Sequence, residues 1–154
     1  MPLVRTLQRA WPSLPMHWVI DKGGYKLLEG LDGVVFHTYD KKSGLAGMRA
    51  LRKELPSEGF DVLLQMQVAF RANVLSGFIP AKRRVGYDHA RAKDLHGLFI
   101  NERIPDRPGI HVLDAIGSFC EPLGLKQTDV TWDLPVPTEA REWAQAQWAD
   151  DGGP

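Results

Sequence analysis

The chain has 154 residues, of which 44% are hydrophobic and 25% charged, a size that suits one domain with a substantial core. Its 19 basic residues balance 19 acidic ones, so no overall field for nucleic acid or a membrane surface is indicated. Cys120 is the only cysteine, which excludes an internal disulfide and fits a reducing compartment. No apolar run approaches the length of a membrane span, and the first residues lack the apolar core of a signal peptide. The sequence therefore predicts a cytoplasmic globular domain.

Helical and strand patterns alternate through the first third of the chain. Leu3 and Leu7 have helical spacing in a segment that stops at Pro12. Ser43 offers an N-cap for a later helix with an apolar stripe that reaches Leu55. Between these helices the pattern predicts a strand over 16–20, a short helix over 25–31 and a strand over 34–38.

The stretch 60–101 is the part around which the chain is organised. Residues 60–64 form an apolar run that is typical of a parallel strand covered on both faces, and 69–76 would return as a crossover helix. Residues 82–87 supply the next strand and 88–94 a polar loop behind it. Ligands bind beyond the carboxyl ends of strands in open parallel sheets. The carboxyl ends of these two strands are therefore expected to lie together and to form a rim of the sheet that carries cationic and hydrogen-bonding side chains.

The last third is predicted to be less regular. Residues 102–109 read as a Pro-rich surface loop, and His111 begins a helix that frays or kinks at Pro122 and ends at Gly124. Residues 126–137 read as linker, Thr138 as the cap of a last helix, and 150–154 as a loose end. We therefore expect a Rossmann-like α/β domain over 1–133, with a mainly parallel sheet and helices on both faces. Residues 134–154 would be a linker and helix leading toward a second domain.

Gln67 and Arg71 are the sharpest local pair of candidate binding residues. They lie four apart on a turn into a helix and can reach one ligand from the same side. Arg71 could instead pack its aliphatic stem and pair with a carboxylate. The basic run 82–84 alternates between two faces of a strand, so at most part of it can serve one ligand.

Three further candidates lie beyond the second strand. Arg91 and Lys93 occupy a loop behind the strand, where ligand contacts concentrate, and both suit phosphate or carboxylate. His111 is a candidate whose commoner role is to begin a helix. Glycine-rich nucleotide motifs, a serine nucleophile elbow and Cys/His metal spacing are missing from the sequence, so no metal or cofactor is expected.

Several segments together resemble the lipopolysaccharide heptosyltransferases of glycosyltransferase family 9. They are residues 3–5, 18–20, 65–71, 81–93, 98–101, 111–114 and 134–137, and their order and spacing carry the likeness. The resemblance implies the N-terminal, acceptor-side half of a two-domain GT-B glycosyltransferase. One departure is local: the family usually has Asp-x-Gln-Gly where this chain has Gln65-Met66-Gln67-Val68.

The resemblance also implies an activity and its partners. Such enzymes transfer heptose from a nucleotide sugar to the lipopolysaccharide inner core, with inversion, at the inner membrane periphery. The acidic acceptor would meet Gln67, Arg71, Arg91, Lys93 and His111. The family places its catalytic base before Met1 and its donor site chiefly beyond Pro154. The expectation is therefore a chain that binds an acidic glycolipid but has no catalytic residue of its own and is inactive alone. The alternative is a non-catalytic binding or self-associating module.

Overall fold

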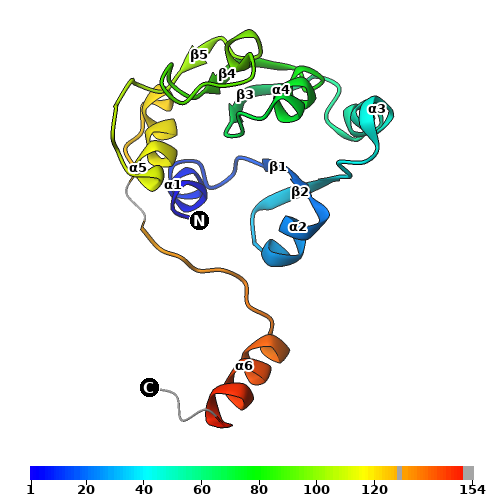
Figure 1. Cartoon of the computed structure of the whole chain (residues 1–154), viewed down its shortest axis with the longest axis vertical. Coiled ribbons are helices and arrows are strands. Elements are labelled where there is room, and N and C mark those ends of the chain that lie inside the picture. The colour runs from blue at the N-terminus through cyan, green and yellow to red at the C-terminus, as the bar shows by residue number, and fades with distance from the viewer. Residues whose placement is uncertain (128–129, 151–154) are drawn as a thin grey trace.

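A computed structural model shows helices and strands alternating along most of the chain (Figure 1). It describes residues 1–127 and 130–150, so residues 151–154 of the predicted C-terminal segment lie outside the described residues. In chain order the elements are α1 (Pro2–Ala10), β1 (Met16–Asp21), α2 (Lys22–Leu28), β2 (Val34–Tyr39), α3 (Gly44–Glu54), β3 (Phe60–Gln65), α4 (Phe70–Gly77), β4 (Ala81–Gly86), η1 (His96–Leu98), β5 (Glu102–Arg103), α5 (Val112–Gly117), η2 (Ser118–Leu123) and α6 (Thr138–Asp150).

All strand pairings are parallel, as the sequence predicts for a Rossmann-like α/β fold. The described strands nevertheless form two sheets rather than one. β1 pairs with β2, and β4 lies between β3 and β5. No backbone ladder joins β1 to β3 in the described part of the chain, although Figure 1 shows these two strands on the inner sides of their sheets.

Two helix starts differ from the prediction in instructive ways. α2 begins at Lys22 rather than Tyr25 because the Asp21 carboxylate accepts hydrogen bonds from the backbone N–H groups of Gly23 at 3.0 Å and Gly24 at 3.1 Å. Ser43 does precede α3, but its hydroxyl donates to the Asp40 carbonyl at 2.5 Å and does not cap the helix. The Ser43 prediction was therefore right in position and wrong in mechanism.

The C-terminal helices also depart from the simple pattern. The helix predicted from His111 is α5 followed by the 3-10 turn η2, which contains Pro122. A proline ring clashes with the preceding turn and lacks an N–H, so an undisturbed α-helix cannot continue there. Gly124 ends η2 in the left-handed region with φ of 74°, as its predicted role requires. The short strand β5 was missed inside the predicted surface loop.

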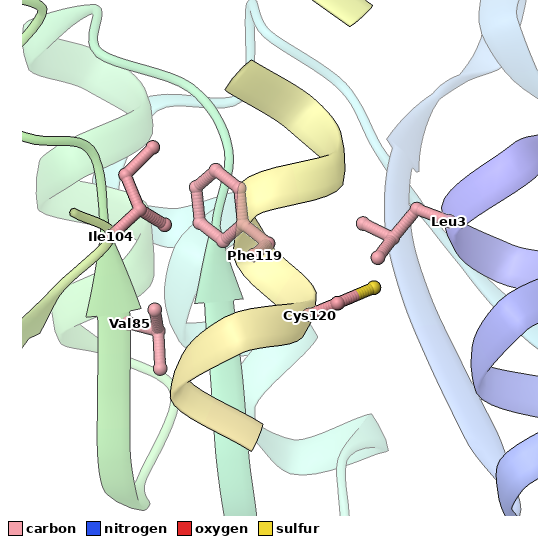
Figure 2. Packing of buried hydrophobic residues seen from close by; sticks show 5 residues of the cluster. All are labelled: Leu3, Val85, Ile104, Phe119 and Cys120. Atoms are coloured by element: carbon pink, nitrogen blue, oxygen red, sulfur yellow. The ribbon is translucent and has the colours of Figure 1, made fainter. Parts of the chain in front are cut away.

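Two apolar clusters cover opposite faces of β3. On one face α1 and η2 supply Leu3, Phe119 and Cys120, which pack with Val85 of β4 and Ile104 (Figure 2). On the other face, Leu51 of α3 and Leu55, which follows that helix, pack with Ile79 and with residues of β1, β3 and α4. The Cys120 thiol is buried, and its pKa is raised because burial disfavours the thiolate.

The segment after η2 leaves this body and ends in α6, which Figure 1 shows apart from the other helices. Arg5 of α1 forms a salt bridge to Asp133 in this segment, with Nη2 and Oδ2 2.6 Å apart. Thr138 is the first residue of α6 rather than its cap. Within the described residues, no helix is both long enough and apolar enough to span a membrane.

Candidate functional site

The carboxyl ends of the first three strands are tied together by one basic segment. Asp21 ends β1, and its Oδ2 lies 2.9 Å from Nζ of Lys41, which follows β2. Nη1 of Arg71, at the start of α4, donates to the Lys41 carbonyl at 2.9 Å. The Lys41 ammonium, with the amides of Gly24 and Gly23, lowers the pKa of the Asp21 carboxyl. These contacts place the ends of β1, β2 and β3 on one rim, where ligands bind in open parallel sheets.

A buried amide connects this rim to the loop after β4. Asn73 of α4 is fully buried, and its Oδ1 accepts a hydrogen bond from Nε2 of Gln65 at 3.1 Å. Its Nδ2 donates at 3.0 Å to each of two backbone carbonyls, those of Val68 and Asp94. One side chain thus holds the end of β3 and the loop 88–95 in a fixed relation.

His96 completes the network and its contacts define its protonation. Nε2 accepts from the Tyr87 backbone N–H at 3.1 Å, so the proton of the neutral ring is on Nδ1, which lies 2.8 Å from Oδ1 of Asn73. Burial, with a contribution from Arg103, lowers the pKa of His96. A neutral ring satisfies both neighbours, whereas protonation of Nε2 would set an N–H against the Tyr87 N–H.

Gly86 is required for this packing. A Cβ at Gly86 would lie 2.6 Å from Cγ2 of Ile100 and still closer to Nε2 of His96. The end of β4 therefore carries glycine because the His96 ring occupies the side-chain space.

The first part of the loop after β4 is held by a buried carboxylate. Asp88 is fully buried and accepts from the Arg91 backbone N–H at 2.9 Å, while its other oxygen pairs with the Arg91 guanidinium. Nη2 of Arg91 donates to the Arg107 carbonyl at 3.1 Å. Arg91 thus joins two loops, and its charge is largely neutralised by Asp88.

The second part of the loop has an unusual backbone. Asp94 and Leu95 both lie in the left-handed region, with φ of 50° and 62°. Such residues cost free energy that the surrounding structure must offset. The Asp94 carboxylate accepts from the Phe70 N–H at 3.2 Å, at the first residue of α4, and its carbonyl accepts from Asn73. This conformation leaves the neighbouring Lys93 side chain exposed at the rim.

The predicted site residues differ in their exposure to solvent and in their hydrogen-bond partners. Gln67, Arg71 and Lys93 are exposed around the end of β3 and the start of α4, and they form the candidate rim. Arg91 is partly buried in its Asp88 pair. His111 is the N-cap of α5, since its Nδ1 accepts from the Leu113 N–H at 3.2 Å.

Each member of the basic run 82–84 has a structural partner. Lys82 pairs with Asp61 at 2.7 Å, and Arg83 makes two hydrogen bonds to the Glu102 carboxylate. Arg84 points to the face opposite to Arg83 and donates to the carbonyls of three residues, Phe99, Ile79 and Ser76. Alternation along β4 separates these side chains, as the pattern predicts.

The sequence did not single out the residues that hold the rim together. Asn73, His96 and Asp94 interact only after α4 and the loop have packed, and Lys41 contributes through its backbone carbonyl as well as its charge. Aspartate adopts the left-handed backbone conformation more readily than most residues, but no sequence pattern predicted that conformation at Asp94. Within the described ranges no group of three or more His, Cys, Asp or Glu could hold a metal ion. The rim offers cations and amide donors, which suit an anionic, hydroxyl-rich ligand.

Comparison with known proteins relates the chain to a family of glycosyltransferases. The family model described as glycosyltransferase family 9 (heptosyltransferase) matches residues 48–151. The lipopolysaccharide core heptosyltransferase OpsX of Haemophilus influenzae is 35% identical over 144 residues, which are 94% of this chain and 42% of that protein. The chain thus spans less than half of the curated relative that it matches.

Solved structures confirm the predicted fold. A glycosyltransferase family 9 structure from Veillonella parvula superposes with a TM-score of 0.77 at 21% identity, covering 98% of this chain and 45% of that one. The E. coli heptosyltransferase WaaC with ADP gives a TM-score of 0.71 at 19% identity, covering 86% of this chain and 45% of that one. The chain therefore has the Rossmann-like fold of roughly half of such a glycosyltransferase.

Proposed function

Because the chain belongs to glycosyltransferase family 9, we propose that it forms the acceptor-binding part of a heptosyltransferase that acts on the lipopolysaccharide inner core. The family match over residues 48–151 carries this proposal, since that range includes the three exposed candidates Gln67, Arg71 and Lys93. The curated relative is a lipopolysaccharide core heptosyltransferase, and the E. coli structure binds ADP. We propose an acidic glycolipid acceptor and a nucleotide-heptose donor by this relationship, with action at the inner membrane periphery.

Arg71 and Lys93 are the residues that we assign to the anionic groups of the acceptor. The Arg71 fork can bind a carboxylate or phosphate through two N–H groups, although one nitrogen already donates to the Lys41 carbonyl. Lys93 is exposed and acts as a mobile point charge. Gln67 supplies a neutral donor and acceptor for sugar hydroxyls. In this proposal Arg91 and His111 support the loop and helix around the acceptor.

We propose that the 154 residues bind the acceptor without completing the transfer. An inverting transfer needs a base to deprotonate the acceptor hydroxyl and a cationic site for the departing diphosphate. The side chains on the rim supply charge and hydrogen bonds, and the buried Asp88 is committed to Arg91. The base and donor site would then belong to other parts of a complete transferase.

Binding and transfer are tested separately. We expect deacylated inner-core saccharide, titrated into the labelled chain by NMR, to shift amides of 67–71 and 88–95. Arg71→Ala and Lys93→Ala should each weaken binding by about fivefold, the scale of one partly exposed charged contact. Lys82→Ala is the matched control, because Lys82 is an exposed lysine near the amino end of β4 and should leave binding unchanged.

Equal weakening by all three substitutions would indicate non-specific charge attraction and contradict the proposed site. Transfer is measured with a nucleotide-heptose donor and mass detection of the product. A heptosylated product made by the 154 residues alone would contradict the second part of the proposal and leave the first intact.

A self-associating module is the second candidate, and the segment 130–148 favours it. Val130, in the segment before α6, is 79% exposed, and Trp143 and Trp148 of α6 are 67% and 68% exposed. Exposed apolar side chains that gather on one surface can mark a contact with another protein. Sedimentation of the purified chain tests this candidate. A dimer that dissociates when Trp143 and Trp148 are replaced by Gln would support it, and a monomer at all concentrations would exclude it.

A further inference from the structure

Three large apolar side chains are exposed beside the candidate rim. Phe70, the first residue of α4, is 55% exposed, Leu95 63% and Leu98 77%. The Phe70 N–H donates to the Asp94 carboxylate at 3.2 Å, and the Leu98 N–H donates to the Leu95 carbonyl at 2.9 Å. The start of α4 and the turn that follows Asp94 are therefore neighbours. We call Phe70, Leu95 and Leu98 the apolar patch.

The backbone of Leu95 is unusual for a leucine. Its φ of 62° lies in the left-handed region, which glycine and asparagine adopt at a lower cost. The conformation is held from below, because the fully buried Asn73 donates at 3.0 Å to the carbonyl of Asp94. The exposed Leu95 side chain gains little packing that would offset the strain. Strained residues of this kind gather at binding surfaces, so the Leu95 conformation points to a ligand rather than to folding.

Exposed cations flank the apolar patch. Arg71 follows Phe70 in α4, and Lys93 precedes Asp94 in the loop; both side chains are exposed. Nη1 of Arg71 donates to the Lys41 carbonyl at 2.9 Å, so the segment that carries these lysines lies beside α4. The Asp94 carboxylate, in contrast, is turned to the first N–H of the helix. The surface around the patch therefore attracts anions.

The size and the chemistry of the apolar patch favour a membrane surface over a protein partner. Three side chains exposed to this degree offer only a few hundred Å² of apolar surface, whereas a stable protein–protein interface takes about 800 Å² from each partner. Apolar side chains that enter the headgroup region and cations that attract anionic lipids are two signals that together hold a protein at a membrane surface.

We propose that Phe70, Leu95 and Leu98 insert into the headgroup region of an anionic phospholipid membrane, while the cations around them attract the lipid phosphates. This inference deepens the proposed function, on which it rests for the glycolipid nature of the acceptor. An acceptor anchored in the same membrane would then reach Arg71 and Lys93 without leaving the lipid.

Vesicle sedimentation of the whole chain tests the apolar patch with lipids that contain no lipopolysaccharide. We expect binding to phosphatidylethanolamine vesicles with about one-third phosphatidylglycerol, and binding at least about tenfold weaker when phosphatidylcholine replaces the phosphatidylglycerol. Leu95→Asn combined with Leu98→Gln should weaken binding to the anionic vesicles by about tenfold, because the inserted apolar groups are lost. Asparagine is chosen at position 95 because it tolerates the left-handed backbone.

The matched control is Leu14→Asn combined with Leu27→Gln. These two leucines are 58% and 72% exposed, and they lie before β1 and in α2, away from the apolar patch. The control makes the same two chemical changes at similar exposure, so it should leave vesicle binding unchanged.

A fluorescent label reports insertion itself. Leu98→Cys can be labelled selectively with the environment-sensitive dye NBD, because the native Cys120 is buried. Its emission should shift to the blue when anionic vesicles are added. The same label on Leu27→Cys should show no shift.

The proposal would be overturned if the chain did not bind anionic vesicles, or if the double variant and its control bound them equally well. A label at position 98 that stays unshifted on bound vesicles would also contradict it. A shift that rises with protein concentration in the absence of lipid would mean that a second copy of the chain covers the patch. The vesicles lack lipopolysaccharide and the saccharide titration lacks a membrane, so failure of this inference and failure of the proposed acceptor site are distinguishable.

Discussion

Strands β4 and β1 look alike in length and parallel pairing, yet their surroundings differ. β4 has a partner on each side, and Val85 near its carboxyl end is fully buried between η2 and neighbouring strands. β1 has one partner, and every one of its residues is half-buried. A parallel strand therefore buries its apolar side chains fully only when another strand pairs with each of its two edges.

The polar groups follow the same division. Near β4 the amide and imidazole groups of Asn73 and His96 are buried and fully bonded. In the other sheet His17 and His37 stack with ring centroids 5.1 Å apart and share a contact of 2.8 Å between ring nitrogens, but both remain half-buried. Polar networks near β4 should thus affect stability more than those near β1.

The largest expected difference is between two phenylalanines. Phe119→Ala should lower the free energy of unfolding by about 3–5 kcal/mol, because Phe119 is fully buried and its loss leaves a cavity. Phe36→Ala on β2 should cost about 1–2 kcal/mol, because water already reaches that half-buried ring. Urea unfolding followed by tryptophan fluorescence measures both. Equal losses would show that the two sheets are packed to the same degree.

Two asparagines sharpen the comparison for hydrogen bonds. Asn73→Ala should cost about 3 kcal/mol, since buried groups of Gln65 and His96 lose a partner that water cannot replace. Asn101→Ala should cost about 1 kcal/mol, because the Asn101 bonds to Arg84 and Lys82 are exposed. The same urea titrations apply. A smaller loss for Asn73 than for Asn101 would mean that the network does not hold the rim.

The smallest effect concerns pH, and both sheets contribute. Burial lowers the pKa of His96 and of His37 below the ordinary 6.5, and the neighbouring His17 adds to the effect on His37. The unfolded chain therefore takes up protons first as the pH falls, so the stability present above about pH 6.5 is lost below it. The slope cannot exceed about 1.4 kcal/mol per pH unit for each histidine.

His96→Gln should flatten this decline more than His37→Gln, because only His96 is fully buried. Thermal unfolding between pH 5 and 8 gives the slopes. An unchanged slope in both variants would show that other groups control acid sensitivity.

Local pattern was enough to predict most elements of the fold. Periodicity and turn residues indicated α1, β1 to β4 and the left-handed end at Gly124, because these depend on neighbours within a few residues. The placing of Gln67, Arg71 and Lys93 around strand ends was likewise predictable, since parallel strands bring their carboxyl ends to one edge. The departure at α2 came from a single side chain, the Asp21 carboxylate, whereas the change of helix type at η2 agrees with the predicted effect of the Pro122 ring.

What the sequence by itself determined, then, was the alternation of elements, the parallel class of the fold and the order of candidate residues along one edge. The tertiary structure alone decided which charged side chains remain available to bind a ligand. It pairs Arg91 with Asp88, turns Arg84 to backbone carbonyls and joins Arg71 to the carbonyl of Lys41, thirty positions away. It also decided that β1 and β3 have no shared ladder. Periodicity reports which face of an element is apolar, whereas partners are set by contacts between residues that the sequence keeps far apart.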